Sequence, residues 1–500
     1  MRRRAKVVLF YPPYGGPPLG APLCLLSLAS PLLQAGFEVK LVDAAITPDF
    51  EQVILRETLD ALCLGISLLT GPMITTAIRI AKAVKRAHPA LPIIFGGWHP
   101  SLVPGQTLQP EFVDGVVRAQ GELTLLELAQ RISEGRTWDG VLGLWFKEGT
   151  SIHQEADRPV ANINSLPAPA FHLAAYDQYE SLSGTRQLAY ASSVGCPYAC
   201  NYCTDMVFYK RRFNAYLAEK VVADLAELVP RYRIDEVALL DSNFLVDIKR
   251  AIAIARGIVA TGVKFRWTFQ ASTDFLWRMS DDEVRLLGES GVTHMGFGTE
   301  SASEKVLKLM NKHHQRIEQM EETARKAELA GIHVTFNVIL GYPEETEEDR
   351  LKTFRIMSEI ARRYWNVSFS PNIFTPYPGI PIWPELKQLG VREPQTLEEW
   401  EEISLGHNVL PWLQGEELGR LRRSLEYFLL NNQIRNATKR SPWLRRGVRR
   451  VLGAPICWRI GSSRYFFPWE LWVSRAVKGI VTRRSLLTGQ KLSERMEEVC

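Results

Sequence analysis

Three closely spaced cysteines are the residues of this sequence with the clearest chemical potential. Cys196, Cys200 and Cys203 form a C-x3-C-x2-C pattern within the run Val-Gly-Cys-Pro-Tyr-Ala-Cys-Asn-Tyr-Cys. Three thiolates in so short a loop can bind one side of a cubane iron–sulfur cluster, which normally takes four cysteine ligands. The fourth iron would then lack a protein ligand, so the pattern predicts that a small molecule binds there.

A structural zinc site is the main alternative for these cysteines. Such sites usually combine two separated pairs of Cys or His ligands, and no second pair lies nearby in the sequence. The other cysteines are widely scattered: they are Cys24, Cys63, Cys457 and Cys500. This scatter does not suggest a disulfide framework, and a low-potential cluster needs a reducing compartment.

The remaining composition is that of a large globular protein. The chain has 500 residues, enough for two or three domains. A basic N terminus precedes an apolar run that is too short for the core of a signal peptide. No apolar stretch approaches the ~18 residues needed to span a bilayer. We therefore expect a cytoplasmic protein.

The cysteines begin a region in which apolar strands alternate with helical patterns. Helices are predicted at Glu219–Val229, Ile248–Ala260 and Leu351–Arg362. Six repeats of strand and helix predict a partial (β/α)6 barrel, whose chemistry would lie at the carboxyl ends of its strands. The predicted strands are Ala189–Val194, Val237–Leu240, Phe265–Gln270, His294–Thr299, Val334–Leu340 and Val367–Phe374.

The N-terminal third has the same rhythm, with helices at Met73–Ala87 and Thr124–Ser133. Strands that alternate with helices predict a doubly wound parallel sheet, which binds ligands beyond the carboxyl ends of its strands. The predicted strands are Lys6–Tyr11, Glu38–Asp43, Ala61–Leu68, Pro92–Phe95, Gly115–Arg118 and Leu142–Phe146. A connector is expected at residues 150–187, and its Pro-rich run at 164–171 is not typical of a helix or strand.

Several runs resemble the radical S-adenosylmethionine (SAM) enzymes that carry a cobalamin (B12)-binding domain. Beside the cysteines, they are Gly-Gly-Trp-His-Pro-Ser, Asp-Ser-Asn-Phe, Gly-Thr-Glu-Ser, Leu-Met-Asn-Lys, Leu-Gly-Tyr-Pro-Glu-Glu-Thr and Pro-Tyr-Pro-Gly. The resemblance spans roughly residues 1–385. It implies an α/β protein with a Rossmann-like cobalamin domain at 1–149, a linker at 150–187, a radical SAM barrel at 188–395 and a mainly helical module at 396–500. Val194, where many relatives have Arg, and the Thr of Gly-Thr-Glu depart from the pattern.

The resemblance also implies a chemistry. SAM would chelate the open iron through its amino and carboxylate groups, and the reduced [4Fe–4S] cluster would cleave it to a 5′-deoxyadenosyl radical. Cys196, Cys200 and Cys203 would be the catalytic cluster ligands. Asp241 and Asn243 would meet the amine of SAM, and Glu300 its ribose hydroxyls. The full set of expected SAM contacts is Tyr202, Asp241, Asn243, Gln270, Ser272, Glu300, Leu340 and Gly341.

Cobalamin would lie against the loops that follow the N-terminal strands. The Asp-x-His-x-x-Gly run that supplies a histidine to cobalt in other B12 proteins is absent. We therefore expect cobalamin without a protein histidine on cobalt, with the Pro/Gly loop at 12–20 beneath it. A flavodoxin-like domain with another role is the alternative. The expected contacts are Pro12, Pro13, Ser67, Thr70, Gly96, Gly97, His99, Gly121 and Glu122.

The C-terminal segment is strongly basic and rich in aromatic residues. Residues 431–500 carry a charge of +11, against +5 for the whole chain. Three interpretations stay open: a helical cap over the substrate pocket, peripheral contact with an anionic membrane, or nucleic-acid binding, which is the least favoured. The run comprises Arg435, Lys439, Arg440, Arg445, Arg446, Arg449 and Arg450, then Trp458, Tyr465, Phe466, Phe467, Trp469 and Trp472.

Together these features predict a cobalamin-dependent radical SAM enzyme, most simply a C-methyltransferase. Its substrate would be a hydrophobic, lipid-like or natural-product-like small molecule, and a flavodoxin- or ferredoxin-type protein would supply electrons. The alternatives are an oxidative cyclase or ring-rearranging enzyme acting on a tetrapyrrole or nucleotide, and a non-catalytic cobalamin-binding sensor. A tRNA methylthiotransferase would need three more N-terminal cysteines, and only Cys24 and Cys63 precede residue 196.

Overall fold

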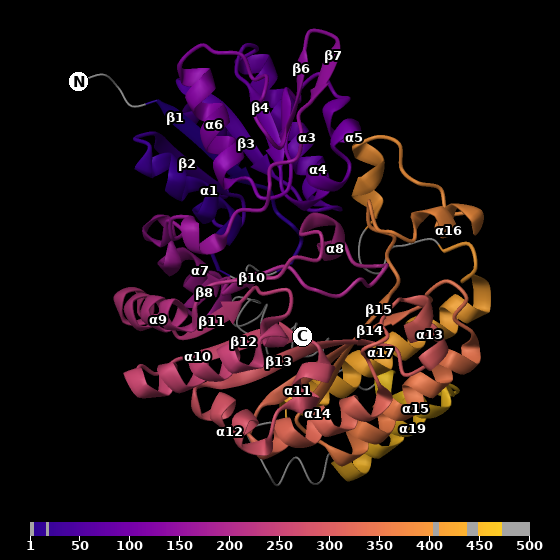
Figure 1. The fold of residues 1–500 in the computed structure, drawn as a ribbon. Helices are drawn as coiled ribbons and strands as arrows, with labels where there is room; N and C mark the ends of the chain where they lie inside the picture. Colours follow the sequence, from indigo (N-terminus) through magenta and orange to yellow (C-terminus); the bar gives the residue numbers. More distant parts are fainter. Residues whose placement is uncertain (1–4, 17–19, 404–409, 438–448, 473–500) are drawn as a thin grey trace, which may run out of the picture.

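The computed structural model describes residues 5–16, 20–403, 410–437 and 449–472. An N-terminal α/β unit stands above a larger α/β unit, and C-terminal helices cover the outer side of the larger one (Figure 1). The predicted fold class is confirmed, because each unit is built on a sheet whose core strands run parallel. The ends of these strands position the functional residues.

The N-terminal sheet has the strand order β2-β1-β3-β4-β5-β6-β7. Alternate residues of β1 enter two cores on opposite faces: Val8 and Phe10 one, Val7 and Leu9 the other. Both faces are thus covered, which explains the nearly continuous apolar runs of these strands. The strands are β1 (Lys6–Tyr11), β2 (Glu38–Asp43), β3 (Ala61–Ser67), β4 (Ile93–Gly96), β5 (Gly115–Val117), β6 (Leu144–Glu148) and β7 (Ser151–Gln154).

The far edge of this sheet corrects the prediction of a wholly parallel arrangement. Strands β6 and β7 form an antiparallel hairpin, and β6 also runs antiparallel to β5. The helices of this unit are α1 (Leu23–Gln34), α2 (Phe50–Glu57), α3 (Met73–Ala87), α4 (Trp98–Leu102), α5 (Pro104–Leu108) and α6 (Glu122–Ser133).

The connector is more ordered than its Pro-rich sequence suggested. Residues 150–187 include β7, the 3-10 turns η1 (Ile163–Ser165) and η2 (Phe171–Leu173), and α7 (Tyr176–Ser183). The hydroxyl of Tyr179 donates a hydrogen bond of 2.5 Å to Asp43 at the end of β2. The connector is therefore packed against the N-terminal unit rather than being a free linker.

The central unit has a six-stranded, wholly parallel sheet in the order β15-β14-β13-β12-β11-β8. The predicted first strand divides in two, because only Gln187–Tyr190 (β8) joins this sheet. Ser193–Val194 (β9) pairs instead with Asn214–Ala215 (β10). The other strands are β11 (Glu236–Leu239), β12 (Arg266–Ala271), β13 (Val292–Glu300), β14 (His333–Leu340) and β15 (Val367–Ile373).

Helices follow most strands of the central unit, as the predicted barrel requires. Side chains at their starts fix where several of them begin: Ser280 caps α12 and Thr346 caps α15, each in a reciprocal capping box. The helices are α8 (Asp205–Phe208), α9 (Ala218–Tyr232), α10 (Ile248–Thr261), α11 (Thr273–Arg278), α12 (Asp281–Glu289), α13 (Glu304–Leu309), α14 (Ile317–Leu329), α15 (Glu347–Arg363) and α16 (Trp383–Gln388), with 3-10 turns η3 (Phe244–Val246) and η4 (Glu398–Glu402).

The C-terminal helices α17 (Gly415–Ala437) and α19 (Ala454–Ser462) pack on β15 and α15, with a π turn, η5, at Arg449–Gly453. Two basic residues of the C-terminal module face inward, one of them from the predicted basic run. Arg435 donates to the carbonyl oxygens of Ala361 and Tyr364, and Arg459 pairs with Glu470 at 2.7 Å. Lys439, Arg440, Arg445 and Arg446 lie outside the described residues.

Four aromatic side chains of this module are nevertheless at least half exposed. Trp458 is 50%, Phe466 67%, Phe467 67% and Trp472 51% exposed. They form two edge-to-face pairs, Trp458 with Phe466 and Phe467 with Trp472. Among the helices that the structure describes, none is both long and apolar enough to cross a membrane.

Candidate functional site

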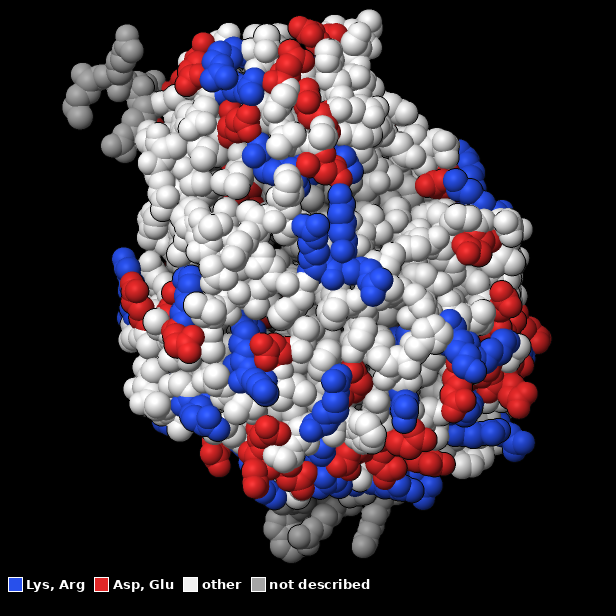
Figure 2. Space-filling model, in the orientation of Figure 1, with Lys and Arg blue, Asp and Glu red and all other residues white. Residues whose placement is uncertain are grey.

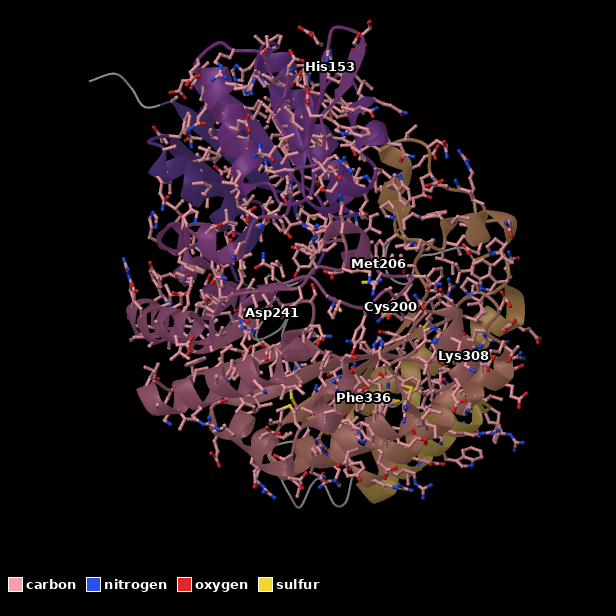
Figure 3. The ribbon with its side chains drawn as sticks, viewed as in Figure 1. His153, Cys200, Met206, Asp241, Lys308 and Phe336 are labelled. Carbon is pink, nitrogen blue, oxygen red and sulfur yellow. The ribbon has the colours of Figure 1, made fainter. Side chains whose placement is uncertain are left out.

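The cysteine loop lies at the end of the central sheet that faces the N-terminal unit, and Figure 3 shows Cys200 and Met206 there. A glycine starts the loop for a steric reason. Gly195 has φ 76°, and a Cβ at this position would overlap the carbonyl oxygen of Arg212. The segment after α8 is therefore packed directly against the start of the loop.

A second loop, residues 309–314, clamps the cysteine loop from the other side. The side chain of Asn201 donates to the carbonyl of Leu309 at 2.8 Å, and Asn311 donates to the carbonyl of Ala199 at 2.7 Å. The rings of Tyr198 and His314 stack with centroids 3.4 Å apart. These contacts come from the Leu-Met-Asn-Lys run and the residues after it, so that run has a positioning role.

The three thiols need a bound metal group to stay deprotonated. Burial raises the pKa of all three, that of Cys203 to about 12. Thiolates would therefore persist there only with a metal group bound to them.

Polar groups from β11 and β12 reach the cysteine loop. The amide of Asn243 donates to the sulfur of Cys196 at 3.9 Å, and its oxygen accepts from the backbone N–H of Ser272 at 3.3 Å. The Ser272 hydroxyl is buried and has no hydrogen-bond partner among the residues that the structure describes. A buried unpaired hydroxyl is costly, so these two residues fit a polar ligand beside Cys196, as predicted for SAM.

Glu300 belongs to a buried, charged triad next to the cysteines. Its Oε1 accepts from the hydroxyl of Tyr202 at 3.0 Å and from Nζ of Lys312 at 3.3 Å. Lys312 also donates to the Tyr202 hydroxyl at 3.2 Å. Although burial alone would lower the pKa of Lys312, the Glu300 carboxylate raises it above its usual value. The ammonium therefore stays charged beside the cysteines.

The backbone at Glu300 is strained. Its φ of 56° lies in the left-handed region, and the register between β13 and β14 shifts between Gly298 and Glu300. Strain of this kind at the end of a sheet strand is typical of functional positions. The bulge turns the Glu300 carboxylate back toward Lys312, across the surface of Gly298.

Asp241 corrects the prediction of a direct contact with the SAM amine. One carboxylate oxygen accepts from the backbone N–H of Ser192 at 2.7 Å, and the other from the hydroxyls of Ser192 and Ser193 at 2.6 and 2.5 Å. Only 2% of Asp241 is exposed. It holds the backbone before the cysteine loop in place and does not face a ligand.

The predicted adenine contact at Leu340–Gly341 is also not supported. Leu340 is fully buried. The N–H of Gly341 donates to Glu345, its carbonyl accepts from the Trp412 indole at 3.0 Å, and Leu413 occupies the space where a Cβ would lie. Gln270, finally, is exposed and lies over Gly296.

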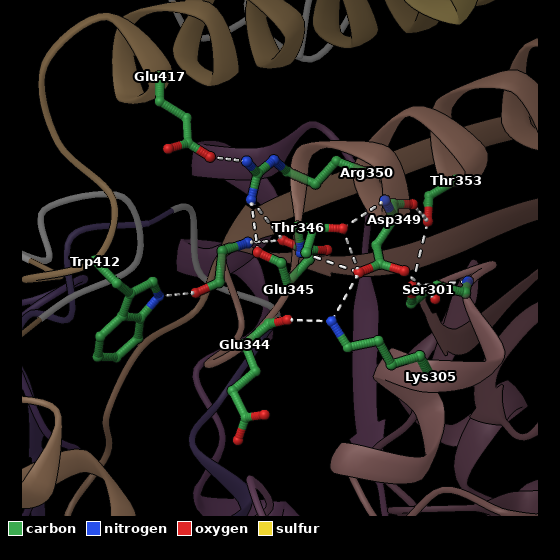
Figure 4. Close-up of polar contacts among 12 residues, drawn as sticks. Ser301, Lys305, Glu344, Glu345, Thr346, Asp349, Arg350, Thr353, Trp412 and Glu417 are labelled. Carbon is green, nitrogen blue, oxygen red and sulfur yellow. Dashed lines mark hydrogen bonds and ion pairs between the residues drawn. The ribbon is translucent and has the colours of Figure 1, made fainter.

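Figure 4 shows the polar contacts around Glu345 and Arg350. Burial raises the pKa of Glu345 to about 7, and Arg350 binds both this carboxylate and Glu417 of α17. Glu345 lies just before α15, which begins at Glu347. This network fixes the β14 loop to the C-terminal module.

A cavity of about 880 Å³ lies between the two α/β units. Residues after β1, β3 and β4 and at the start of α6 form one wall, while Tyr190, Val194 and Leu240 belong to the other. None of the described residues that line it is a histidine. Seven of the nine predicted cobalamin contacts line it, namely Pro12, Pro13, Ser67, Gly96, Gly97, Gly121 and Glu122.

Glycine and proline make the N-terminal wall of this cavity smooth. Gly97 has φ 93°, and a Cβ there would lie 2.7 Å from the carbonyl oxygen of Leu68. Glu122 is at the first position of α6, where burial raises its pKa. A broad apolar surface with a few polar groups fits a corrin ring with its amide side chains.

Thr70 and His99 do not line the cavity, which corrects their predicted role as cobalamin contacts. They bond each other, with Thr70 Oγ1 and His99 Nδ1 3.0 Å apart. Burial lowers the pKa of His99 to about 3, so its ring is neutral. The ring packs edge-to-face on Trp400, at a centroid distance of 5.8 Å. His99 therefore joins the N-terminal unit to the segment after the barrel.

Known proteins share both halves of this arrangement. The model of the radical SAM superfamily matches residues 190–357, and that of the B12 binding domain matches residues 14–129. An uncharacterized methyltransferase of Pyrococcus horikoshii is 30% identical over 374 residues, which cover 74% of this chain and 78% of that protein. The anaerobic magnesium-protoporphyrin IX monomethyl ester cyclase of Rubrivivax gelatinosus is 23% identical over 397 residues, which cover 76% and 70%.

A solved structure has the same fold. It is the radical SAM methyltransferase TsrM from Kitasatospora setae with cobalamin and a [4Fe–4S] cluster bound, with a TM-score of 0.67 and 21% identity over 78% of this chain and 80% of that one. The chain belongs to the family of radical SAM enzymes that carry a B12-binding domain, and the resemblance seen in its motifs is confirmed.

Sequence reasoning missed the role of Lys312. The run Leu-Met-Asn-Lys was part of the resemblance, but no role followed from it. A lysine buried to 5% exposure is unusual without an ionic partner. The only sequence signal was its place in a motif, because its partners Glu300 and Tyr202 come from two other loops.

Proposed function

We propose that this chain is a C-methyltransferase that acts on an unactivated carbon of a bulky, mainly apolar small molecule. The observation that carries the proposal is the largely apolar cavity of about 880 Å³ between the strand ends of the two units. Its lining reaches Val194, two residues before Cys196. A cofactor held by one unit and a radical source held by the other would therefore face the same space.

The bound cofactors would supply the chemistry: a cluster-bound SAM gives a radical that takes a hydrogen atom, and methylcobalamin gives the methyl group. The protein's own task is to bind, orient and exclude water. Cys196, Cys200 and Cys203 would hold the cluster. Asn243 and Ser272 would meet SAM beside Cys196, and the triad with Glu300 would meet its ribose and keep a positive charge near the cluster.

We propose that cobalamin binds in this cavity without a protein histidine on cobalt. No histidine occurs among the described residues of its lining, and His99 is neutral and already bonded to Thr70. Electron paramagnetic resonance of the cob(II)alamin form tests this directly. The expected spectrum has no splitting from a histidine nitrogen, and such a splitting would contradict the assignment.

We further infer a cytoplasmic protein with peripheral membrane contact through the C-terminal module. The four exposed aromatic side chains, Trp458, Phe466, Phe467 and Trp472, support it, because indole rings settle at the level of lipid headgroups. Since Arg435 and Arg459 face inward, the remaining basic residues would supply the attraction to anionic lipid. Flotation with anionic vesicles at low salt, lost as salt rises, is the expected result.

The experiment that tests methyl transfer is anaerobic incubation of reconstituted protein with methyl-deuterated SAM and cell extract. A product whose mass increases by one deuterated methyl group supports methylation. An oxidative cyclase is the second candidate, favoured by the cyclase relative. It would give 5′-deoxyadenosine and a product without deuterium. A cobalamin sensor would give no SAM cleavage.

A further inference from the structure

We propose that a basic patch beside the cysteine loop is the docking surface for the acidic redox protein that reduces the cluster. The patch comprises Lys210, Arg211 and Arg212, with Arg118 and Arg158 of the facing unit. The proposal rests on the proposed radical SAM function, because the cluster of such an enzyme must receive an electron before it can cleave SAM. One electron would pass from the partner, which is oxidised, to the cluster, which is reduced, and no bond would form or break.

The patch is attached to the cysteine loop. The guanidinium Nε of Arg211 donates to the carbonyl oxygen of Pro197, the residue after Cys196, at 3.2 Å. The backbone of Arg212 closes on Gly195, and Asn214 pairs with Val194 in the small sheet of β9 and β10. A protein seated on these residues would therefore contact the loop that holds the cluster.

The backbone of the patch is held in a conformation that such residues rarely adopt. Lys210 has φ 51° and Arg211 has φ 59°, two successive non-glycine residues in the left-handed region. Each such residue costs roughly 1 kcal/mol or more, and such strain concentrates at functional sites. Here the strained turn exposes three successive cationic side chains at the surface.

A groove of about 250 Å³ adjoins the turn. Arg118, Arg158, Lys210 and Arg212 line it, and among its described lining residues Asp157 is the only acidic one. Asp157 binds both Arg118 and Lys210, and Glu127 binds Arg158. These two carboxylates offset part of the positive charge, and Arg211 and Arg212 add to it. Figure 2 shows Lys and Arg side chains gathered at the middle of this face, where the two units meet.

The groove is separate from the central cavity but shares a wall with it. Phe208 and Ala119 line both, and the Phe208 ring packs on Trp98 with centroids 4.2 Å apart. A partner in the groove would therefore not enter the space proposed for substrate. The cluster could be reduced while substrate is already bound.

The chemistry of the patch favours an acidic protein over a nucleic acid. Binding of single-stranded nucleic acid combines basic residues with exposed aromatic rings on which bases stack. The rings beside this patch are only partly exposed. Phe208 and Tyr209 pack against Trp98, and Trp145 lies beneath the Arg118 guanidinium. Flavodoxins and ferredoxins offer carboxylates, which cations steer into contact without requiring a large apolar interface.

The test compares a protein donor with a chemical one. Lys210→Gln/Arg212→Gln leaves the Arg211 tether intact, and a triple variant adds Arg211→Gln. The matched control, Lys249→Gln/Arg256→Gln/Lys264→Gln, removes three exposed cations from α10 and the loop after it. Each reconstituted protein is reduced anaerobically by reduced flavodoxin or by titanium(III) citrate. Bleaching of the cluster absorption, flavodoxin binding and 5′-deoxyadenosine are measured.

With flavodoxin at low salt, cluster reduction should slow about tenfold or more in the triple variant, and less in the double variant. With titanium(III) citrate all proteins should be reduced equally. Added salt should lower the rate of cluster reduction by flavodoxin in the wild type toward that of the triple variant. The rate of the triple variant itself should hardly change. A triple variant as fast with flavodoxin as the wild type would overturn the docking surface. Absence of SAM cleavage with titanium(III) citrate in the wild type would instead contradict the proposed function.

Discussion

The strand ends of the central unit and those of the N-terminal unit face each other, and the two surfaces would hold their cofactors by different means. At the end of the central barrel, Tyr202, Glu300 and Lys312 form a buried set of charges paired with one another. At the N-terminal wall of the cavity, glycines such as Gly97 let the backbone come close, and charged side chains are few. The buried charges of the central unit would act on a ligand through electrostatics. The N-terminal wall would select a ligand through its shape.

This difference predicts how each end fails. A buried charge pair is destabilised strongly when one partner is removed, because the other charge stays buried and unpaired. A smooth apolar wall has no such pair to break and is instead sensitive to added volume. Substitutions on one side should therefore leave the cofactor of the other side in place.

The largest expected effect comes from the cysteines. Cys196→Ala, Cys200→Ala or Cys203→Ala should abolish the iron–sulfur absorption and the formation of 5′-deoxyadenosine, since three thiolates are the fewest that can hold the cluster. Cobalamin should still bind, because the N-terminal wall is unchanged. Iron content and absorption spectra measure the loss of the cluster. Bound cobalamin is measured separately on the same protein. Cys500→Ala is the control, and loss of the cluster in that variant would contradict the ligand assignment.

Lys312→Met should have the next largest effect. It leaves the Glu300 carboxylate buried without its cation, at a cost of about 3–5 kcal/mol in the free energy of unfolding. The double variant Lys312→Met/Glu300→Gln removes both charges and should recover much of this loss. Urea unfolding of the three proteins measures it. If the double variant is no more stable than Lys312→Met, the two residues do not act as a pair.

Glu300→Gln should weaken ligand binding as well as folding, because the buried Lys312 ammonium loses its carboxylate. The amide can still accept from Tyr202, but the carboxylate proposed to bond the ribose is lost. A hydrogen bond to a charged group contributes about 1.5–3 kcal/mol, so SAM affinity should fall about ten- to a hundredfold with the cluster intact. Equilibrium binding of SAM to reconstituted protein measures this. Glu304→Gln, an exposed carboxylate on α13, should bind SAM normally, and unchanged affinity in Glu300→Gln would make Glu300 purely structural.

Much of the fold could be predicted because buried parallel strands are short apolar runs between helices. The predicted bounds of Lys6–Tyr11, Glu38–Asp43 and Met73–Ala87 are those of β1, β2 and α3. The direction of β6 could not be read from its apolar residues. A two-residue turn at 149–150, between Glu148 and Ser151, was the available sign of a hairpin.

The site was predictable where the motif itself makes the contact. Tyr202 and Glu300, both expected to contact SAM, lie together and are joined by a hydrogen bond. Asp241, His99 and Gly341 were misassigned, because their partners are Ser192, Trp400 and Trp412. For His99 and Gly341 the partner lies in the C-terminal part of the chain, where no motif indicated packing against the two units. Tertiary contacts of this kind have no local signature in a single sequence.

The smallest expected effect tests the wall of the cavity. Gly97→Ala adds a single methyl group at φ 93°, 2.7 Å from the Leu68 carbonyl oxygen. The backbone must move, which should weaken cobalamin binding while the cluster and SAM binding remain.

Gly184→Ala is the matched control, since Gly184 has φ 73° and nothing within 4 Å of the added Cβ. Both variants carry the left-handed strain of about 1 kcal/mol, but only Gly97→Ala crowds the wall. Equilibrium cobalamin binding to each protein separates the two effects. Equal cobalamin affinity in both variants would mean that the shape of the wall at Gly97 does not select the cofactor. The N-terminal wall would then not differ from the central unit in the way proposed.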